Sequence, residues 1–322
     1  MTVSVAMCTY NGACYIEEQI DSILRQTYSP HEIIICDDQS TDNTIEILKS
    51  VKEKWGKNTN INIIINNSRL GIAKNFEKAI SLCSEELIFL SDQDDIWYPQ
   101  KIEKIIAFFI EHPKTNVIFS NADILINKDI YRKTLYDILN FDQKAQFFFK
   151  KGFEFELLNI TNRIIGATLA FRADFIKRHI PFPKFNEMIH DEIISLYAIK
   201  THSLSFITDC LICYRQHQSQ VVGLNSFLNN IPTSDVLQYR PIRYSPKAIN
   251  IFMTENKRNI YDYRAKCIKS IWGLFYMLFG IRLYKITYME YFPNVIKKDI
   301  TLYFDINKRR IMTRIGHIFH KA

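Results

Sequence analysis

The chain lacks the features that mark secreted and membrane-spanning proteins. Its first four residues carry no basic segment before an apolar run and lead straight into a strand-like sequence, so we expect no cleaved secretory signal. The most apolar stretch, residues 271–281, is too short to span a bilayer and predicts a buried or interfacial helix. Together these absences predict a cytoplasmic protein.

Cysteines are too irregular for a disulfide framework. The sequence contains seven, an odd number, and several lie inside apolar segments where a thiol packs as a small hydrophobic group. Cys210 and Cys213 form one CxxC pair, and His202 or His217 would have to help complete a four-ligand zinc site. A single CxxC within a strand-like run is a weak zinc signal, so core or surface thiols are favoured.

The composition is that of an ordinary globular protein. Of 322 residues, 47% are hydrophobic and 23% are charged, which is enough to bury a large core in one domain or in a domain with an appendage. The net charge of +7 suits an anionic partner such as a nucleotide or a lipid headgroup, although charge alone identifies none. We expect no nucleic acid partner.

Short apolar segments alternate with segments of helical periodicity through the first hundred residues. Strands are predicted at residues 3–8, 32–36, 61–65 and 87–90, and helices at residues 14–26, after residue 44 and at 75–83. Such alternation predicts an α/β fold with a mainly parallel sheet covered on both faces by helices. In sheets of this kind, ligands bind beyond the carboxyl ends of the strands.

An acidic cluster follows the last of these strands. Residues 90–97 have the sequence LSDQDDIW, which brings Asp92, Asp94 and Asp95 together at the carboxyl end of a buried strand. Carboxylates so close repel one another, and a hard divalent cation that also binds diphosphate oxygens would relieve that repulsion. An Asp-rich turn without a ligand is the alternative, but turn geometry alone does not require this many carboxylates.

The loops after the first and third strands carry residues suited to a nucleotide. After the first strand, Gly12 permits a tight turn and Tyr10 is available to stack on a base. After the third strand, Arg69 and Lys74 are available to meet phosphate charge. Each loop is weak support by itself, whereas the loops together predict a nucleotide pocket closed by a metal.

The loop after the second strand is acidic as well. Asp37 and Asp38 supply carboxylates that can accept the imide N–H of uracil or thymine. Thr41 or Asp42 is favoured as the N-cap of the helix that follows. The loop therefore favours a pyrimidine nucleotide.

Four segments carry a resemblance to a known family. CTYNG, CDDQSTDNT, NSRLGIAKN and LSDQDDIW occur in an order and spacing that resembles the nucleotide-sugar half of family 2 glycosyltransferases with the GT-A fold. SDQDDIW is especially similar to the bacterial branch that includes rhamnosyltransferases and other polysaccharide-assembly enzymes. The resemblance is close over the first hundred residues and looser to Gly223. It implies a GT-A domain at residues 1–238, with a nucleotide-sugar half (1–100) and an acceptor half (101–238).

The resemblance also implies roles for individual residues. Asp94 falls where the family binds its metal, Asp92 completes the Asp-x-Asp pair, and the expected metal is Mn²⁺ or Mg²⁺. His217 is a candidate for a further metal or diphosphate ligand, and a purely structural role for it is equally open. The expected nucleotide-sugar contacts are Thr9, Tyr10, Asn11, Asp37, Asp38, Arg69, Gly71, Lys74, Asp92 and, as a phosphate clamp, Arg215.

Asp191 resembles the general base of the family. It precedes a segment of helical periodicity and would take the proton from an acceptor hydroxyl that attacks the anomeric carbon opposite the diphosphate. A single displacement inverts the anomeric configuration, and no carboxylate suggests a retaining course. A helix N-cap followed by Glu192 is the structural alternative, and one residue can serve both purposes. The strand-like segments 117–123 and 166–172 would line the acceptor side.

The pattern of apolar and basic residues changes after residue 238, and residues 239–322 are predicted to form a helical appendage. Near its end, one helical face is apolar and the opposite face is basic, which is typical of helices that lie on anionic membranes. Peripheral contact with the inner face of the cell membrane would suit a lipid-linked acceptor, and packing on the catalytic body is the alternative. The apolar residues are Ile311, Met312, Ile315, Ile318 and Phe319, and the basic residues are Lys308, Arg309, Arg310, Arg314 and Lys321.

The sequence leaves two other functions open. Asp92-Gln93-Asp94 after an apolar strand also resembles the nucleophile loop of haloacid dehalogenase-type phosphohydrolases, although those enzymes place it on their first strand. A non-catalytic, membrane-attached scaffold that binds nucleotide sugars is the second alternative. The favoured function is inverting, metal-dependent transfer of a sugar, with a lean toward rhamnose, from a UDP or dTDP donor to a hydroxyl. The acceptor would be a glycan or a lipid-linked molecule in bacterial surface polysaccharide synthesis.

Overall fold

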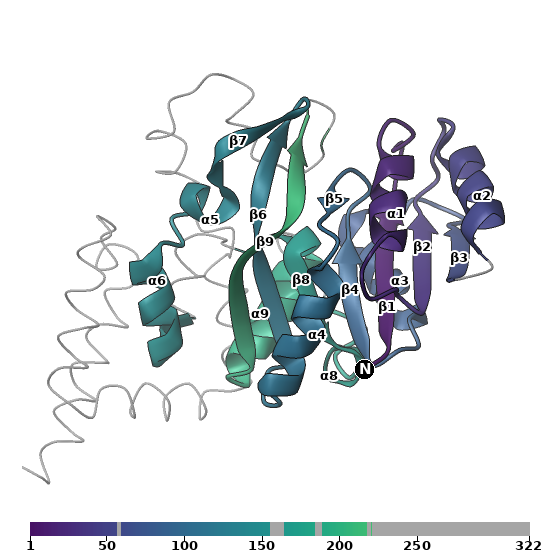
Figure 1. Cartoon of the computed structure of the whole chain (residues 1–322). Helices are drawn as coiled ribbons and strands as arrows, with labels where there is room; N and C mark the ends of the chain where they lie inside the picture. The colour runs from purple at the N-terminus through teal and green to yellow at the C-terminus, as the bar shows by residue number, and fades with distance from the viewer. Residues whose placement is uncertain (57–58, 155–163, 184–188, 218–219, 221–322) are drawn as a thin grey trace, which may run out of the picture. The chain divides into compact units, whose positions relative to one another are not determined.

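The computed structural model describes residues 1–56, 59–154, 164–183, 189–217 and 220 (Figure 1). These residues build one sheet with the strand order β3-β2-β1-β4-β8-β6-β9-β5, and β7 pairs with β6. The strands are β1 (Val3–Thr9), β2 (Glu32–Asp37), β3 (Asn60–Ile65), β4 (Leu87–Ser91), β5 (Ile96–Trp97), β6 (Val117–Ile126), β7 (Asp129–Thr134), β8 (Leu169–Arg172) and β9 (Leu204–Gln216). The helices are α1 (Ile16–Leu24), α2 (Thr44–Trp55), α3 (Ile72–Leu82), α4 (Lys101–Glu111), α5 (Leu135–Ile138), α6 (Gln143–Phe148), α8 (Ala173–Lys177) and α9 (His190–Lys200).

Strands β1 to β4 form the parallel part of the sheet that the alternation in the sequence predicts. β1 pairs with β2 and β4, and β2 pairs with β3, all in parallel. β1, β2 and β4 are buried along almost their whole length, which explains why their sequences are continuous apolar runs. The predicted strands and helices of this half are therefore present, with boundaries shifted by a few residues.

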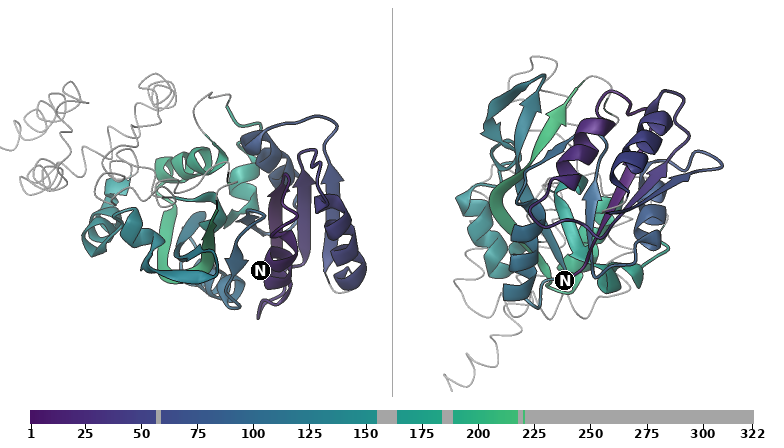
Figure 2. Two further views of the ribbon diagram at one scale, coloured as in Figure 1. Left: turned by 90° about the horizontal axis from the view of Figure 1, so that it is seen from above. Right: turned by 45° about the vertical axis from the view of Figure 1, so that its right-hand side comes forward.

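Helices cover both faces of the sheet (Figures 1 and 2). α1, α2 and α4 pack on one face, where Ile20, Leu48 and Ile105 join the same core cluster as Val5 and Phe89. α3, α8 and α9 lie on the other face. The chain moves outward from β1 through α1 and α2 and then returns through α3 to β4, so the strand order reverses between β1 and β4. A reversal of this kind opens a crevice at the carboxyl ends of the two strands.

Beyond β4 the sheet is mixed. β8 lies antiparallel between β4 and β6, whereas the long strand β9 runs parallel to β6. The prediction of one strand over residues 166–172 is wrong for its first part, because Gly166–Thr168 forms a 3₁₀ turn and β8 begins at Leu169. The Thr168 hydroxyl donates to the Ile165 carbonyl at 2.7 Å, a local bond that favours a turn over a ladder.

The described residues leave part of the predicted organisation untested. The predicted appendage at residues 239–322, its boundary with the GT-A domain, and Gly223 all lie outside them. Among the helices that are described, none has the length and apolar character needed to cross a membrane. The six cysteines of the described residues are free thiols, and Cys210 and Cys213 lie within β9.

Candidate active site

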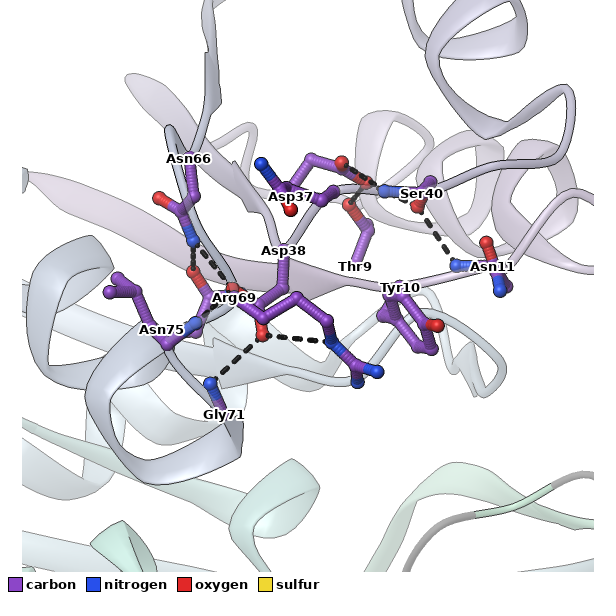
Figure 3. A network of polar contacts seen from close by, with 12 residues as sticks. Thr9, Tyr10, Asn11, Asp37, Asp38, Ser40, Asn66, Arg69, Gly71 and Asn75 are labelled. Carbon is purple, nitrogen blue, oxygen red and sulfur yellow. Dashed lines mark hydrogen bonds and ion pairs between the residues drawn. The ribbon is translucent and has the colours of Figure 1, made fainter.

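The site lies where the carboxyl ends of β1, β2 and β4 meet. Thr9 at the end of β1 is in register with Asp37 of β2, and Met7 of β1 is in register with Ser91 of β4. The loops that follow these strands therefore begin side by side. They carry most of the residues that the sequence predicted for the nucleotide sugar, as Figure 3 shows for the loops after β1 and β2.

Asp37 organises the loop after β2. Its carboxylate is fully buried and accepts hydrogen bonds from the Thr9 hydroxyl at 2.8 Å and from the Ser40 N–H and hydroxyl at 2.8 and 2.5 Å (Figure 3). The Ser40 hydroxyl in turn accepts from the Asn11 N–H at 2.8 Å. Through these bonds Asp37 joins the end of β1 to the loop after β2.

The helix α2 is capped differently from the prediction. Its N-cap residue is Asn43, so Thr41 does not cap the helix. Asp42 accepts from the Thr44 N–H at 3.1 Å and from the Ala13 N–H at 3.0 Å, so its carboxylate supports the first turn and also binds the loop after β1. The Thr44 hydroxyl accepts a hydrogen bond from the Gly12 N–H at 2.8 Å. The start of α2 thus fixes the loop that carries Tyr10.

Asp38 is the aspartate that faces the loop after β3. It accepts from the Leu70 N–H at 2.7 Å, the Gly71 N–H at 2.9 Å and the Asn66 side-chain amide at 2.9 Å (Figure 3). Burial by itself would raise the pKa of this carboxyl, but these donors outweigh burial and lower the pKa below its ordinary value. Gly71 has a φ of 78°, a backbone conformation that favours glycine and lets its N–H point at the carboxylate.

Arg69 covers the ring of Tyr10. The guanidinium carbon lies 3.7 Å from the ring centre, and Nε lies 4.0 Å from Asp38 (Figure 3). The Arg69 side chain is more than half exposed. A cation–π contact at an exposed site contributes only about 0.5–1 kcal/mol, so a base that stacks on Tyr10 can displace the guanidinium. The predicted stacking face is present and is occupied by a side chain that a ligand can replace.

Gln93 is a site residue that the sequence analysis missed. Its side-chain amide accepts from the Tyr10 N–H at 2.8 Å and donates to the Tyr10 carbonyl at 3.0 Å, so it binds the loop as a paired strand would. A Cβ on Gly12 would lie 2.3 Å from Gln93 Oε1, which explains why glycine is needed there. The sequence shows an amide side chain between two aspartates, but Tyr10, the residue that this amide binds, lies 83 residues away in the chain.

The acidic loop after β4 is anchored to the end of β9. Asp94 Oδ2 lies 2.7 Å from His217 Nε2, and Asp95 Oδ1 accepts from the Arg215 N–H at 3.0 Å. Arg215 donates through Nε to the Asp94 carbonyl at 2.6 Å and through Nη2 to Glu18 at 2.5 Å. The guanidinium predicted as a phosphate clamp therefore supports the acidic loop and α1 in this structure.

Two carboxyls of this loop, Asp92 and Asp95, have raised pKa values. Burial, and then the neighbouring Asp94, raise the pKa of Asp92 to about 7, against the opposing charge of Lys101. Burial and the charges of Asp94 and Asp92 also raise the pKa of Asp95 well above its ordinary value. Asp95 Oδ2 is buried without a hydrogen-bond partner among the described residues. Crowded carboxylates of this kind hold a surplus of negative charge that a cation would relieve.

Lys101 and His190 are further buried polar groups that the sequence did not reveal as site residues. Burial lowers the pKa of Lys101 to about 7, and the charges of Asp95 and Asp92 act against that shift. Burial lowers the pKa of His190 to about 3, and its ring stacks on Phe76 at 3.9 Å between centres. Both ring nitrogens of His190 lack a partner within the described residues.

Asp191 lies in the first turn of α9 and is buried. Its Oδ1 accepts from the Glu192 N–H at 2.7 Å, and a Cβ built on Gly166 would lie 3.7 Å from Asp191 Cβ, so Gly166 packs against it. Burial is the main cause that raises the pKa of Asp191 to about 8, and the charges of Glu192 and Asp92 add to it. The N-cap of α9 is Ile189, so the alternative that Asp191 is a helix N-cap is wrong.

Lys74 is the predicted nucleotide contact that the structure separates most clearly from the others. Its Nζ forms an ion pair with both carboxylate oxygens of Glu77, each at 2.8 Å, one turn further along α3. The ion pair is local to the helix. A role for Lys74 at phosphate stays a prediction, whereas Thr9, Tyr10, Asn11 and Asp38 lie together as expected.

Comparison with known proteins agrees with this architecture. Residues 4–178 match the family described as glycosyl transferase family 2. The dTDP-rhamnosyl transferase RfbG of Shigella flexneri is 31% identical over 238 residues, which cover 68% of this chain and 74% of that protein. The UDP-Glc:alpha-D-GlcNAc-diphosphoundecaprenol beta-1,3-glucosyltransferase WfgD of Escherichia coli is 26% identical over 268 residues, which cover 81% of this chain and 96% of that protein.

A solved structure shares the fold. The crystal structure of S. aureus TarS 1-349 in complex with UDP-GlcNAc is similar with a TM-score of 0.53 and 18% identity, over 84% of this chain and 81% of that chain. The fold is thus that of the GT-A glycosyltransferases. The chain belongs to the family 2 glycosyltransferases. This assignment removes the phosphohydrolase alternative.

Proposed function

We propose that the protein is an inverting, metal-dependent glycosyltransferase with a UDP or dTDP sugar as donor. The observation that carries the proposal is that the acidic loop after β4, His217 after β9 and Asp191 at the start of α9 lie close together. The Asp94–His217 pair lies 2.7 Å apart, Asp92 belongs to the same loop, and Asp92 is close enough to Asp191 to raise its pKa. An acidic loop for the diphosphate and a buried carboxylate for the acceptor are thus neighbours.

The nucleoside would bind across the loops after β1, β2 and β3. Asp38 is held ionised by its N–H donors and is therefore suited to accept the imide N–H of uracil or thymine. The base would stack on Tyr10 in place of Arg69, whose guanidinium would then be free to meet the diphosphate. Because both pyrimidines carry the same imide group, these contacts favour UDP and dTDP alike.

A divalent metal fits the donor set. Asp92 and Asp94 offer carboxylate oxygens, which suit Mn²⁺ and Mg²⁺, and His217 beside Asp94 offers an imidazole nitrogen as a further candidate ligand. No three metal-binding side chains are already arranged around one point in the part of the chain that the structure describes. Such metals take about one or two carboxylates from the protein and complete their coordination with water and substrate phosphates, so an incomplete protein cage is expected. When bound, the metal would neutralise the diphosphate leaving group.

Asp191 would act as the general base. A carboxylate with a raised pKa is a stronger base than an exposed one, and burial excludes competing water. In the transfer, the acceptor oxygen forms a bond to the anomeric carbon as the bond from that carbon to the diphosphate oxygen breaks. The hydroxyl proton goes to Asp191, and the nucleoside diphosphate leaves with the electron pair. One displacement of this kind inverts the anomeric configuration.

The relatives support a particular chemistry for the sugar and the acceptor. RfbG is named a dTDP-rhamnosyl transferase, and WfgD is named for transfer to a diphosphoundecaprenol-linked sugar. We propose rhamnose as the first sugar to test and a glycan or lipid-linked glycan hydroxyl as the acceptor, in bacterial surface polysaccharide synthesis. Contact of the basic residues near the end of the chain with the inner face of the membrane would bring such an acceptor close.

A ligand panel on the purified chain tests the proposal. Thermal unfolding is measured with UDP, dTDP, GDP and their sugars, with and without Mn²⁺ or Mg²⁺, for wild type, Asp94→Ala and the exposed control Asp209→Ala. Stabilisation by a pyrimidine diphosphate that needs metal and is lost only in Asp94→Ala supports the proposal. No stabilisation by any nucleotide overturns it. Nucleotide binding that survives Asp191→Asn, with no turnover by either protein, would favour the non-catalytic scaffold.

A further inference from the structure

Lys101 is a buried lysine near the site. It is the first residue of α4 and is fully buried. Its Nζ donates to the Ala167 carbonyl at 2.9 Å and lies 3.9 Å from the centre of the Trp97 ring. A buried ammonium is costly unless opposite charges compensate it, and here Asp95 and Asp92 supply them. The charge of the lysine thus interacts with the acidic loop. Its hydrogen bond goes to a second segment, which contains Ala167.

That second segment is the turn that supports the proposed base. Ala167 is the middle residue of the 3₁₀ turn Gly166–Thr168, and Gly166 packs against the start of α9. A Cβ on Gly166 would lie 3.0 Å from His190 Nε2 and 3.7 Å from Asp191 Cβ. The turn therefore touches the start of α9 directly, and any shift of the turn changes the packing around Asp191.

We propose that Lys101 is a positioning residue that holds the turn Gly166–Thr168 against the acidic loop and so fixes Asp191 relative to the departing diphosphate. The inference rests on the proposed function and adds a physical link between its donor and acceptor sides. The link is short: one hydrogen bond joins Lys101 to Ala167, and the preceding residue, Gly166, packs against His190 and Asp191. Because misplacing a reacting group by about 1 Å can cost about 100-fold in rate, a link of this kind acts on turnover.

A lysine that only neutralised the acidic loop would behave differently. Removing its charge would make the loop around Asp92 and Asp94 more negative, which changes the affinity for a metal and for the nucleotide that binds with it. Removing a positioning residue leaves donor binding in place and slows the reaction of the bound donor. Measuring donor affinity and kcat separately therefore distinguishes a lysine that positions the base from one that only neutralises the acidic loop.

The test compares Lys101→Met with Lys104→Met. Methionine keeps the length of the buried chain and removes its charge and donor, and Lys104 is an exposed lysine of the same helix, paired with Asp209. The affinity for UDP with Mn²⁺ is measured by calorimetry. Turnover is measured as release of UDP or dTDP from the best-bound sugar donor with water as the acceptor. We expect Lys101→Met to lower kcat by about 10- to 100-fold with a donor Kd within about threefold of wild type, and Lys104→Met to leave both unchanged.

Gly166→Ala tests the other end of the link. Its added Cβ would press on His190 and shift the turn, so the same loss of kcat without loss of donor affinity is expected. If both substitutions break one link, the double variant loses no more than about threefold beyond the more impaired single variant. If Lys101→Met does not fold, the kcat and donor affinity of Gly166→Ala still test the link.

Several results would overturn the inference. A Lys101→Met protein with the kcat of Lys104→Met, a loss confined to donor affinity, or effects of Lys101→Met and Gly166→Ala that multiply would each show that Lys101 does not position the base. Failure of the proposed function is visible separately, because wild type itself would then neither bind UDP or dTDP with Mn²⁺ nor release it from a sugar donor. That outcome overturns both.

Discussion

The donor side and the acceptor side of this enzyme are built in different ways. On the proposed donor side, Asp37, Asp38 and Gln93 accept hydrogen bonds from backbone N–H groups of the loops after β1, β2 and β3. On the proposed acceptor side, Asp191 stands at the start of a buried helix, accepts from the N–H of its neighbour Glu192 and lies against one 3₁₀ turn. A network with many bonds resists the loss of any one, whereas a side chain held by few contacts does not. Substitutions should therefore affect mainly binding on the donor side and mainly turnover on the acceptor side.

The largest effect is expected at Asp191. Asp191→Asn keeps the size of the side chain and removes its capacity to accept a proton, so kcat should fall by about 10²- to 10⁴-fold. The affinity for UDP with Mn²⁺ should stay within about threefold of wild type, because no nucleotide contact is changed. Calorimetry and turnover measured on the same preparation check both values. A variant that keeps its kcat would remove Asp191 from the mechanism.

The two adjacent aspartates after β2 should differ. Asp38→Asn removes a charged acceptor from the nucleoside site and should weaken UDP binding by about 10- to 100-fold. Both substitutions disrupt a buried acceptor of several donors and should lower the free energy of unfolding by about 1–3 kcal/mol, whereas Asp37→Asn should leave the affinity for UDP within about threefold of wild type. Calorimetry and chemical denaturation separate the two effects. Equal losses of affinity with equal stability would contradict the division of roles.

Gly12→Ala tests the preformed donor loop. The added Cβ would meet the Gln93 amide, which then has to release Tyr10 or move, and the free energy of unfolding should fall by about 1–3 kcal/mol. The matched control is Gly71→Ala, where no atom lies within 4 Å of the added Cβ and the cost is confined to the positive φ. If Gly12→Ala unfolds at the same denaturant concentration as wild type, the Gln93 contact does not hold the loop.

Stability should depend on pH through Asp191. Its pKa is about 8 in the folded protein, against an ordinary value of 3.8, so between these pH values the folded state holds a proton that the unfolded chain releases. Raising the pH across this range therefore lowers the free energy of unfolding. In Asp191→Asn the decline should be smaller, as measured by urea titrations between about pH 5 and pH 8. Parallel pH profiles for the two proteins would argue against a raised pKa.

The smallest effect is expected at Lys74. Since Glu77 binds its ammonium, Lys74→Met should change the affinity for UDP by less than about threefold. Arg69→Met, by contrast, removes a cation that lies over Tyr10 beside Asp38 and should have the larger effect of the two. Calorimetry with UDP and Mn²⁺ ranks them. The opposite order would restore Lys74 to the phosphate site that its spacing predicted.

The sequence predicted the donor half better than the acceptor half. Buried parallel strands are continuous apolar runs, so β1, β2 and β4 were evident, and the residues that follow such strands necessarily share one edge of the sheet. The turn Gly166–Thr168 was mistaken for a strand because its small residues run directly into the apolar residues of β8, which hid the local bond from the Thr168 hydroxyl to the Ile165 carbonyl. Lys101, at the start of a helix after proline, resembled an ordinary exposed lysine.

The sequence alone determined the α/β order, the family and the set of polar residues at the strand ends, because these depend on periodicity and on motifs whose members are close in the chain. Only the tertiary structure decided which of these polar residues form hydrogen bonds with which partners. Gln93 binds Tyr10, Arg215 binds the acidic loop, and Lys101 binds the turn beside Asp191, across separations of 83, 121 and 66 residues. Such pairings arise when packing brings distant loops together and leaves each buried polar group to find a partner, and no local pattern encodes that choice.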